Sequence, residues 1–445
     1  MFIRFVLENF LSFREETEFN MLVGNFKAHK QHVYSGTIDT LRAAAIYGAN
    51  GAGKSNIIKG IEFLQEIVKN DGLILSVNNY KFKLDKENKD KAISFEIELL
   101  LDNRIYAYGV NLDNNIVLNE WLFENSITKK DKMIFERSTS KKGITKIKLD
   151  KQYNKTKKQQ LLVELMEENL LKSNELFLCK DVELKLDVIS NFKDAILNNI
   201  VVIHPQSKYK NLTPHISLSE EFKGFANSLL KTFDTGVNEL KVEKIEFDKF
   251  FGEDDEELKE EIILDLEDNE AVLIYHKGKD LLISKEEDKF YVEKLVSNHL
   301  DKDGNNISFE IEDESDGTQR LLDFIPAFNG ILNNDITFII DEIDQSLHPA
   351  LLKSLVSKIM SEENTKGQLI FTTHESNLLD LDIFRQDEIW FVEKNKSIGS
   401  SNIYSLSEFK PRYDLDIRKG YLKGRFGAIP FLANLEDLNW SDYES

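Results

Sequence analysis

Hydrophobic and polar residues alternate over two long stretches near the N-terminus. The first stretch predicts two strands, Met1–Leu7 and Thr17–Leu22, joined by a short connection. The second stretch, residues 92–124, places apolar side chains at every other position from Ile93 to Leu99 and continues the pattern beyond. Asp113-Asn114-Asn115 is typical of a hairpin turn. This part of the chain is therefore predicted to form an antiparallel β region, with one face buried.

Other segments are continuously apolar or follow a helical period. The apolar runs are 42–47, 199–204, 335–340 and 368–373. Runs of this length, rich in Ile, Val, Ala and Phe, are typical of strands buried on both faces of a sheet. Helical spacing follows the first run and extends over 158–198 and 217–240, and two short strand-like runs lie at 271–284. The pattern predicts an α/β protein with a mixed sheet.

Composition limits the class of protein. The 445 residues include 57 basic and 78 acidic side chains, for a net charge of −21, and one cysteine, Cys179. One cysteine excludes an intramolecular disulfide and a Cys-rich zinc site. The acidic balance disfavours a surface that binds nucleic acid everywhere. No run of about 20 apolar residues is present, and charges interrupt the N-terminus, so we expect a cytoplasmic protein that does not enter a membrane.

The changes of pattern predict four segments. Residues 1–125 form an N-terminal lobe, and residues 126–300 an insertion that is mostly helical with some strands. Residues 301–395 form a C-terminal lobe, and residues 396–445 an extension packed on it. The insertion begins with a basic run in which eight lysines fall between Lys141 and Lys158. Such a run is either a solvated face or a site for phosphate or a partner, and the sequence leaves both open.

The stretch Gly48–Ser55 fits the pattern G-x-x-x-x-G-K-[ST] of a phosphate-binding loop. An apolar run precedes it and a helical period follows, as the motif requires; the alternative is a chance glycine-rich turn. In such loops backbone N–H groups and a helix N-terminus surround the phosphates, the lysine reaches the β- and γ-phosphates, and the serine holds Mg²⁺. The candidate nucleotide-binding residues here are Gly48, Asn50, Gly51, Gly53, Lys54, Ser55 and Asn56.

A second apolar run, 335–340, ends in the carboxylates Asp341 and Glu342. This is the Walker B pattern, which is only moderately specific by itself, because many buried strands end in acidic residues. Together with the phosphate loop it predicts Asp341 as a Mg²⁺ ligand beside Ser55 and Glu342 as the general base that activates water. The end of a buried strand reaches the carboxyl edge of the sheet, where open α/β folds bind phosphates.

The order of motifs resembles the ABC-type ATPase heads, a group that includes RecF, the SMC proteins and the OLD-like ATPases. The resemblance covers residues 1–125 and 300–395 and implies a P-loop ATPase that uses ATP and Mg²⁺. In that group a signature turn contacts the γ-phosphate held by a second subunit, and Ser315, Gly317 and Thr318 match this turn. Asp316 departs from the common signature, and a plain helix cap is the alternative for Ser315. Residues 344–348 match the dimer-contacting D-loop.

Two more residues have open interpretations. His374 follows the apolar run 368–373 and matches the switch histidine that hydrogen-bonds the γ-phosphate. The alternative is a histidine with a purely structural partner at a strand end. Gln206 follows the run 199–204 and has the position of the Q-loop glutamine. An ordinary surface glutamine fits that position equally well.

The chain also resembles the stand-alone ATPases of the abortive-infection AbiL/RloA type, relatives of the Septu and PARIS ATPases. The matching residues are 9–13, 341–349, 386–393 and 419–430. The resemblance implies a bacterial anti-phage ATPase that works as a nucleotide-gated homodimer or higher oligomer and controls a separate effector protein, often a nuclease. The alternative is a RecF/SMC-like DNA-repair or DNA-maintenance ATPase. An OLD-like nuclease would need a further catalytic domain, and only 71 residues follow His374.

Overall fold

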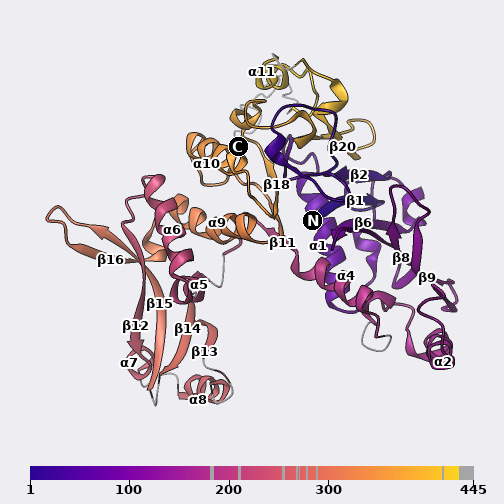
Figure 1. The fold of residues 1–445 in the computed structure, drawn as a ribbon, viewed down its shortest axis with the longest axis horizontal. Helices are drawn as coiled ribbons and strands as arrows, with labels where there is room; N and C mark the ends of the chain where they lie inside the picture. Colours follow the sequence, from indigo (N-terminus) through magenta and orange to yellow (C-terminus); the bar gives the residue numbers. More distant parts are fainter. Residues whose placement is uncertain are drawn as a thin grey trace, which may run out of the picture. The chain divides into compact units, whose positions relative to one another are not determined.

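The chain forms two compact units in the computed structural model (Figure 1). The first unit contains Met1–Pro205, Ile331–Asp344 and Lys353–Ser445, and the second contains Gln206–Gly330 and Gln345–Leu352. The structure describes residues 1–180, 185–208, 212–252, 256–266, 269, 271–276, 279–286, 289–412 and 415–429.

A six-stranded sheet contains the apolar runs predicted to be buried strands. In spatial order its strands are β11 (Ile200–Ile203), β17 (Thr337–Ile340), β18 (Gln368–Thr373), β5 (Ala43–Gly48), β19 (Ile389–Lys394) and β20 (Ser401–Ser405). The first five are parallel, and β20 is an antiparallel edge strand. The carboxyl ends of β17, β18 and β5 therefore meet at one edge of the sheet, with β18 in the middle.

A seven-stranded antiparallel sheet is the second layer of this unit. In spatial order its strands are β10 (Thr145–Leu149), β9 (Lys132–Thr139), β8 (Ile116–Asn125), β7 (Arg104–Asp113), β6 (Ile93–Leu101), β1 (Phe2–Glu8) and β2 (Thr17–Asn20). The first helix, α1 (Lys54–Lys69), shares one hydrophobic core with both sheets. That core contains Phe5 of β1, Ile57 of α1 and Ile46 of β5. A Cβ added at Gly60 of α1 would lie 3.1 Å from the Phe5 ring, so the helix packs closely against this sheet.

The remaining elements of the first unit are short. They are β3 (Val33–Tyr34), β4 (Thr40–Leu41), α2 (Lys157–Leu165), α4 (Asp187–Asn198), α11 (Ile417–Leu422) and most of α10 (Pro349–Ser361). In the described part of the chain, every helix is too short or too polar to cross a membrane.

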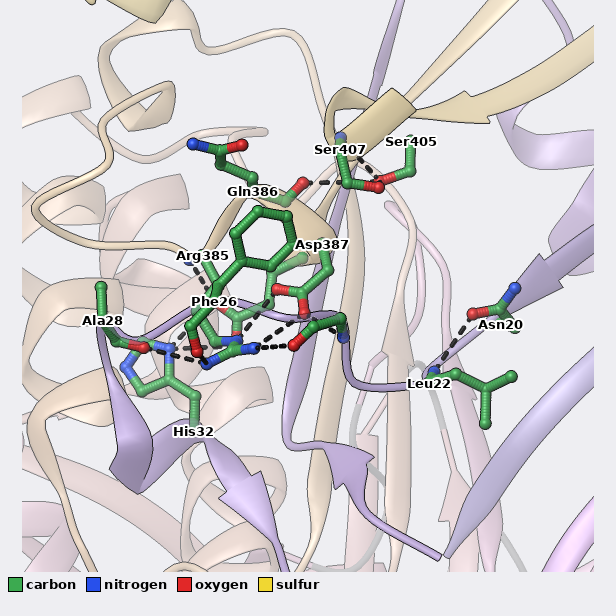
Figure 2. Close-up of polar contacts among 12 residues, drawn as sticks. Asn20, Leu22, Phe26, Ala28, His32, Arg385, Gln386, Asp387, Ser405 and Ser407 are labelled. Atoms are coloured by element: carbon green, nitrogen blue, oxygen red, sulfur yellow. Dashed lines mark hydrogen bonds and ion pairs between the residues drawn. The ribbon is translucent and has the colours of Figure 1, made fainter. Parts of the chain in front are cut away.

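A buried ion pair between Arg385 and Asp387, just before β19, hydrogen-bonds the backbone of the loop after β2 (Figure 2). The Arg385 guanidinium lies 2.8 Å from the Asp387 carboxylate, and both side chains are almost fully buried. The same guanidinium donates to the carbonyl oxygen of Ala28 over 2.9 Å. Next to it, the buried His32 ring lies 2.9 Å from the Glu388 carboxylate. Burial raises the pKa of Glu388, and the contact with His32 opposes that shift.

The second unit is built around an antiparallel sheet. Its strands run in the order β12 (Glu239–Glu246), β15 (Lys289–Leu300), β14 (Lys279–Glu286) and β13 (Ala271–His276), and β16 (Asn306–Glu310) also pairs with β15. The helices are α5 (Leu212–Leu218), α6 (Glu220–Thr232), α7 (Phe247–Phe251), α8 (Glu256–Asp265) and α9 (Asp316–Asn333), whose last turn belongs to the first unit. Phe247, Phe251 and Val292 are part of a core in this unit.

The insertion predicted at 126–300 differs from these units in extent and content. Residues 126–205 belong to the first unit, where β9 and β10 continue the antiparallel sheet. A fully buried ion pair between Glu120 and Arg137 joins residues 126–205 to the rest of this sheet. Glu120 accepts from the Phe177 N–H over 2.7 Å, and Arg137 donates to the Glu175 carbonyl over 2.6 Å. The second unit contains a sheet as well as helices. Strands such as β12 mix lysine and glutamate with apolar residues, which hides their period.

Candidate nucleotide-binding site

The predicted phosphate loop connects β5 to α1. Gly53, the residue before α1, has a φ of 116°, which strongly favours glycine. A Cβ at this position would come within 2.3 Å of the Ser401 hydroxyl oxygen and 2.8 Å of the Ser12 hydroxyl oxygen. A Cβ at Gly48 would lie 2.5 Å from the carbonyl oxygen of Val392 in β19. The two glycines therefore allow the loop to approach its neighbours closely. Asn50 and Gly51 lie exposed at the tip of the loop, and Ser55 is the second residue of α1.

Lys54 is buried, with 6% of its side chain exposed, and is held inside the loop. Its Nζ donates to the carbonyl oxygen of Gly48 over 2.8 Å and lies 2.9 Å from Nε2 of His374. Burial lowers the pKa of the ammonium from its ordinary value of 10.5 to about 8, while Asp341, Glu342 and Asp344 oppose that shift. The cation is thus confined where the motif predicts the β- and γ-phosphates.

His374 follows β18 and lies next to the loop, as the switch interpretation requires. Its backbone N–H donates to Oδ1 of Asp344 over 3.2 Å. Burial and the nearby Lys54 cation both lower the pKa of the imidazole, burial being the larger cause. An ammonium can only donate, so Nε2 accepts and the neutral ring carries its proton on Nδ1. Its partner in this structure is the phosphate-loop lysine itself.

The two carboxylates follow β17, and Thr372 of β18 contacts the Asp341 carboxylate and the Glu342 backbone. The Thr372 hydroxyl donates a short hydrogen bond to Oδ1 of Asp341, which is 5% exposed. The same hydroxyl oxygen accepts from the backbone N–H of Glu342 over 2.8 Å. Glu342 has a φ of 52°, in the left-handed region that non-glycine residues rarely occupy. Strain of this kind is common at functional sites.

Three residues that touch this site were not among the candidates. Thr372 was seen only as part of a strand, and Ser12 and Ser401 lie on segments far apart in the sequence. The Ser401 hydroxyl donates to the carbonyl oxygen of Ala52, and its oxygen lies 2.7 Å from Ser12 Oγ. Asn56 of α1, a candidate, donates to the same Ser12 oxygen over 2.8 Å. For Ser12, the only signal in the sequence was its position as a polar residue in the connection after the first strand.

The residues present fit ATP and Mg²⁺. The loop has the glycines and the helix start that the motif requires, with the buried Lys54 cation held against it. No cluster of three metal-ligating side chains occurs among the described residues. Mg²⁺ in phosphate sites takes only one or two protein ligands and completes its shell with phosphates and water. Ser55 and Asp341 are the residues that would hold it.

The candidate signature turn lies in the second unit, at the start of α9. Ser315 caps this helix, because its Oγ accepts from the Thr318 N–H over 3.2 Å and lies 2.9 Å from the Thr318 hydroxyl. A Cβ at Gly317 would lie 3.0 Å from the carbonyl oxygen of Ser346, in the predicted D-loop. The cap is compatible with both interpretations of Ser315.

Gln206 is exposed and begins the second unit. Its assignment as the Q-loop residue stays a prediction.

These features define a class of protein. A phosphate loop after one parallel strand, two carboxylates after a second and a histidine after the strand between them are the arrangement expected of a P-loop, ABC-like AAA ATPase. The sequence matches a family model described as "AAA domain, putative AbiEii toxin, Type IV TA system" over residues 43–162 and 192–380. The chain belongs to this family.

Solved structures with a similar fold include three SMC heads. An SMC head domain from Thermotoga maritima is 11% identical, with a TM-score of 0.39, over 91% of this chain and 98% of that one. An SMC head bound to the C-terminal winged-helix domain of ScpA is 13% identical, with a TM-score of 0.44, over 92% and 99%. A Pyrococcus furiosus SMC head bound to the C-terminal domain of ScpA is 15% identical, with a TM-score of 0.40, over 92% and 97%. These scores are too low to support an argument about function. No curated protein matches the sequence.

Proposed function

We propose that this protein binds and hydrolyses ATP and acts as a nucleotide-gated dimeric switch. The observation that carries the proposal is the convergence of Lys54, Asp341 and His374 at one edge of the parallel sheet. Lys54 lies 2.9 Å from His374, and Asp341 accepts a hydrogen bond from Thr372, at the end of the strand that His374 follows. These groups supply a cation, a metal ligand and a neutral hydrogen-bonding ring around one phosphate loop.

Hydrolysis would depend mainly on positioning and charge, as in other phosphoryl transfers. Lys54 would bind the β- and γ-phosphates, and Ser55 and Asp341 would hold Mg²⁺, which would neutralise part of the phosphate charge. Glu342 takes a proton from the attacking water. His374 leaves Lys54 and hydrogen-bonds the γ-phosphate. The products are ADP and phosphate.

A hollow beside the phosphate loop suits the nucleoside half of ATP. Its volume is about 570 Å³, and Ser12, Asn56 and Tyr80 are among the residues that line it. The Tyr80 ring is 37% exposed and stacks on the Phe10 ring with centroids 6.0 Å apart. An exposed aromatic face next to the loop is a suitable surface for a base.

The gate would be a second copy of the chain. Ser315, Gly317 and Thr318 of one copy complete the ATP site formed by Lys54 of the other, so that ATP closes the dimer and hydrolysis opens it. ATP can drive closure only by contacts that the open form lacks. The signature turn is suited to this role because it offers N–H groups at the start of a long helix.

The biological role would be anti-phage defence in the bacterial cytoplasm, with control of a separate effector such as a nuclease. Support comes from membership of a family described as a putative AbiEii toxin of a type IV toxin–antitoxin system, and from the AbiL/RloA-like sequence pattern. The second candidate, a RecF/SMC-like DNA-maintenance ATPase, shares the ATPase head. Purification with the products of neighbouring genes, with and without a non-hydrolysable ATP analogue, separates the two.

The dimer is tested by mixing two inactive variants. Lys54→Ala and Ser315→Arg should each abolish hydrolysis. A mixed dimer contains one site with Lys54 and Ser315 both intact, so mixing should restore activity, and Lys54→Ala mixed with Glu342→Gln should not. Failure to restore activity, with dimers present, would contradict the shared site. No hydrolysis by the wild type would contradict the proposal as a whole.

A further inference from the structure

The outer face of the seven-stranded sheet carries side chains that the ATP site does not use. On β8, Asn119, Trp121 and Phe123 alternate with the buried Glu120 and Leu122. Trp121 and Phe123 are half-buried and do not belong to the hydrophobic core, which contains Leu122. Two aromatic rings therefore lie next to each other on the exposed face of a sheet, about 7 Å apart along the strand.

The indole of Trp121 lies flat on a glycine. Gly109 of β7 is its direct neighbour across the sheet, and a Cβ at Gly109 would come within 2.0 Å of the indole ring. Only glycine allows the ring to cover the β7 backbone in this way. Its other face borders a hollow of about 450 Å³, which Phe123 and Lys146 also line. This arrangement forms a flat platform for a planar group.

A row of polar side chains crosses the sheet next to the platform. The pairing of strands aligns Ser94, Asn111, Asn119, Ser138 and Lys146, one from each of five strands. Asn111 donates to the Ser94 hydroxyl oxygen over 2.6 Å, and the next three positions are exposed. Amide and hydroxyl groups beside an aromatic platform suit the edges of a nucleobase.

The β9–β10 edge of this face is rich in lysine, in contrast to the acidic chain as a whole. Residues 129–158 contain twelve basic and three acidic side chains, whereas the chain has a net charge of −21. Lys142 is exposed at the β9–β10 turn, and Lys146 and Lys148 point outward from β10, where Lys146 lies 3.0 Å from the Glu167 carboxylate. The carboxylates in the Trp121 row are paired: Glu136 lies 3.3 Å from Lys148, and Glu96 lies 2.5 Å from Arg4. An anionic chain would therefore be attracted to the β9–β10 edge.

We propose that this face binds single-stranded nucleic acid. Two bases stack on Trp121 and Phe123, and the phosphates lie along the lysines of the β9–β10 hairpin. Stacking platforms beside a basic edge are the usual means of binding single strands. A duplex hides its base faces within the stack, so it cannot use the platform. The inference is independent of ATP hydrolysis, because none of its residues belongs to the ATP site.

The experiment measures the fluorescence anisotropy of a labelled oligothymidylate with the full chain. Trp121→Ala should weaken binding about tenfold, and Trp121→Phe should retain most of it. Phe309→Ala, which removes an aromatic ring that is 41% exposed in the second unit, is the matched control and should bind normally. Lys142→Gln and Lys146→Gln should each lower the slope of log K against log salt by about 0.7, and Lys358→Gln, on α10, should not. The variants should keep the unfolding temperature and ATPase rate of the wild type.

The alternative outcomes contradict the proposal in different ways. Salt-dependent binding that Trp121→Ala leaves unchanged would mean that the lysines attract any polyanion and that the platform is not used. Equal affinity for duplex and single strand would exclude base stacking. If the chain bound an arginine-rich peptide but no oligonucleotide, and Trp121→Ala weakened the peptide binding, the face would be assigned to a protein partner. Lys54→Ala should bind the oligonucleotide like the wild type, which keeps this test separate from the ATPase.

Discussion

The Nζ of Lys54 and the Nε2 of His374 lie 2.9 Å apart, although 320 residues separate them. Lys54 begins α1 after β5, and His374 follows β18, the strand next to β5. The contact places the cation that would bind phosphate against the ring that would sense it. A bound phosphate would compete with His374 for the Lys54 ammonium, so the pair would link the nucleotide to β18.

Nucleotide affinity should fall at alkaline pH. Burial lowers the pKa of Lys54 to about 8 in the free protein, and phosphate binding requires the charged form. The affinity should stay constant below pH 8 and weaken about tenfold for each pH unit above it, until the pKa of the bound state is reached. Titration of a non-hydrolysable ATP analogue at several pH values measures this. Lys54→Arg, which stays charged, should lack the change, and an identical pH profile in that variant would assign it to another group.

Glu342→Gln should bind ATP but hydrolyse it slowly. The amide cannot take the proton from water, and general-base catalysis contributes about 10²- to 10⁴-fold. We expect a loss in kcat of that size and an accumulation of ATP-bound dimers, measured by size-exclusion chromatography. Glu363→Gln, at an exposed position, is the control. Equal hydrolysis by the wild type and Glu342→Gln would remove Glu342 as the base.

Thr372→Val should weaken the metal site without removing a ligand. The hydroxyl bonds both Asp341 and the backbone of Glu342 and so positions them. Loss of such a supporting group typically costs about 10- to 100-fold in metal affinity or activity. The Mg²⁺ concentration that gives half-maximal ATPase activity should rise accordingly, and Thr372→Ser should restore it. A defect shared equally by the valine and serine variants would point to packing as the cause.

Arg385→Met should destabilise the first unit. The substitution leaves Asp387 buried without its cation, which typically costs about 3–5 kcal/mol. It also removes the bond to the Ala28 carbonyl that holds the N-terminal loop. Urea unfolding measures the change. Arg425→Met, at an exposed arginine, should cost about 1 kcal/mol or less, and the same small loss at Arg385 would show that the buried pair contributes little.

The phosphate loop was predictable from sequence because its requirements are local. Glycines at Gly48 and Gly53, a preceding strand and a following helix are neighbours in the chain, and the structure has them where the motif places them. The strand before Asp341 and the strand before His374 were predictable for the same reason. Their apolar runs are long enough to indicate burial on both faces.

The second unit was less predictable. Strands such as β12 and β15 carry charged residues at positions that a helix would also expose, and only pairing with each other defines their buried face. The expected boundary at residue 126 also separates residues that the ion pair between Glu120 and Arg137 joins within the first unit. A buried ion pair between two strands leaves no periodic signal in the sequence.

By itself, the sequence determined which residues end each strand and which chemistry they carry: a cation at Lys54, carboxylates at Asp341 and Glu342, and a histidine at 374. Only the tertiary structure decided that β18 lies between β5 and β17, so that Thr372 positions the Asp341 carboxylate and the Glu342 backbone and His374 meets Lys54. Strand order arises from hydrogen bonds and packing between segments some 300 residues apart, and local side-chain patterns do not encode it.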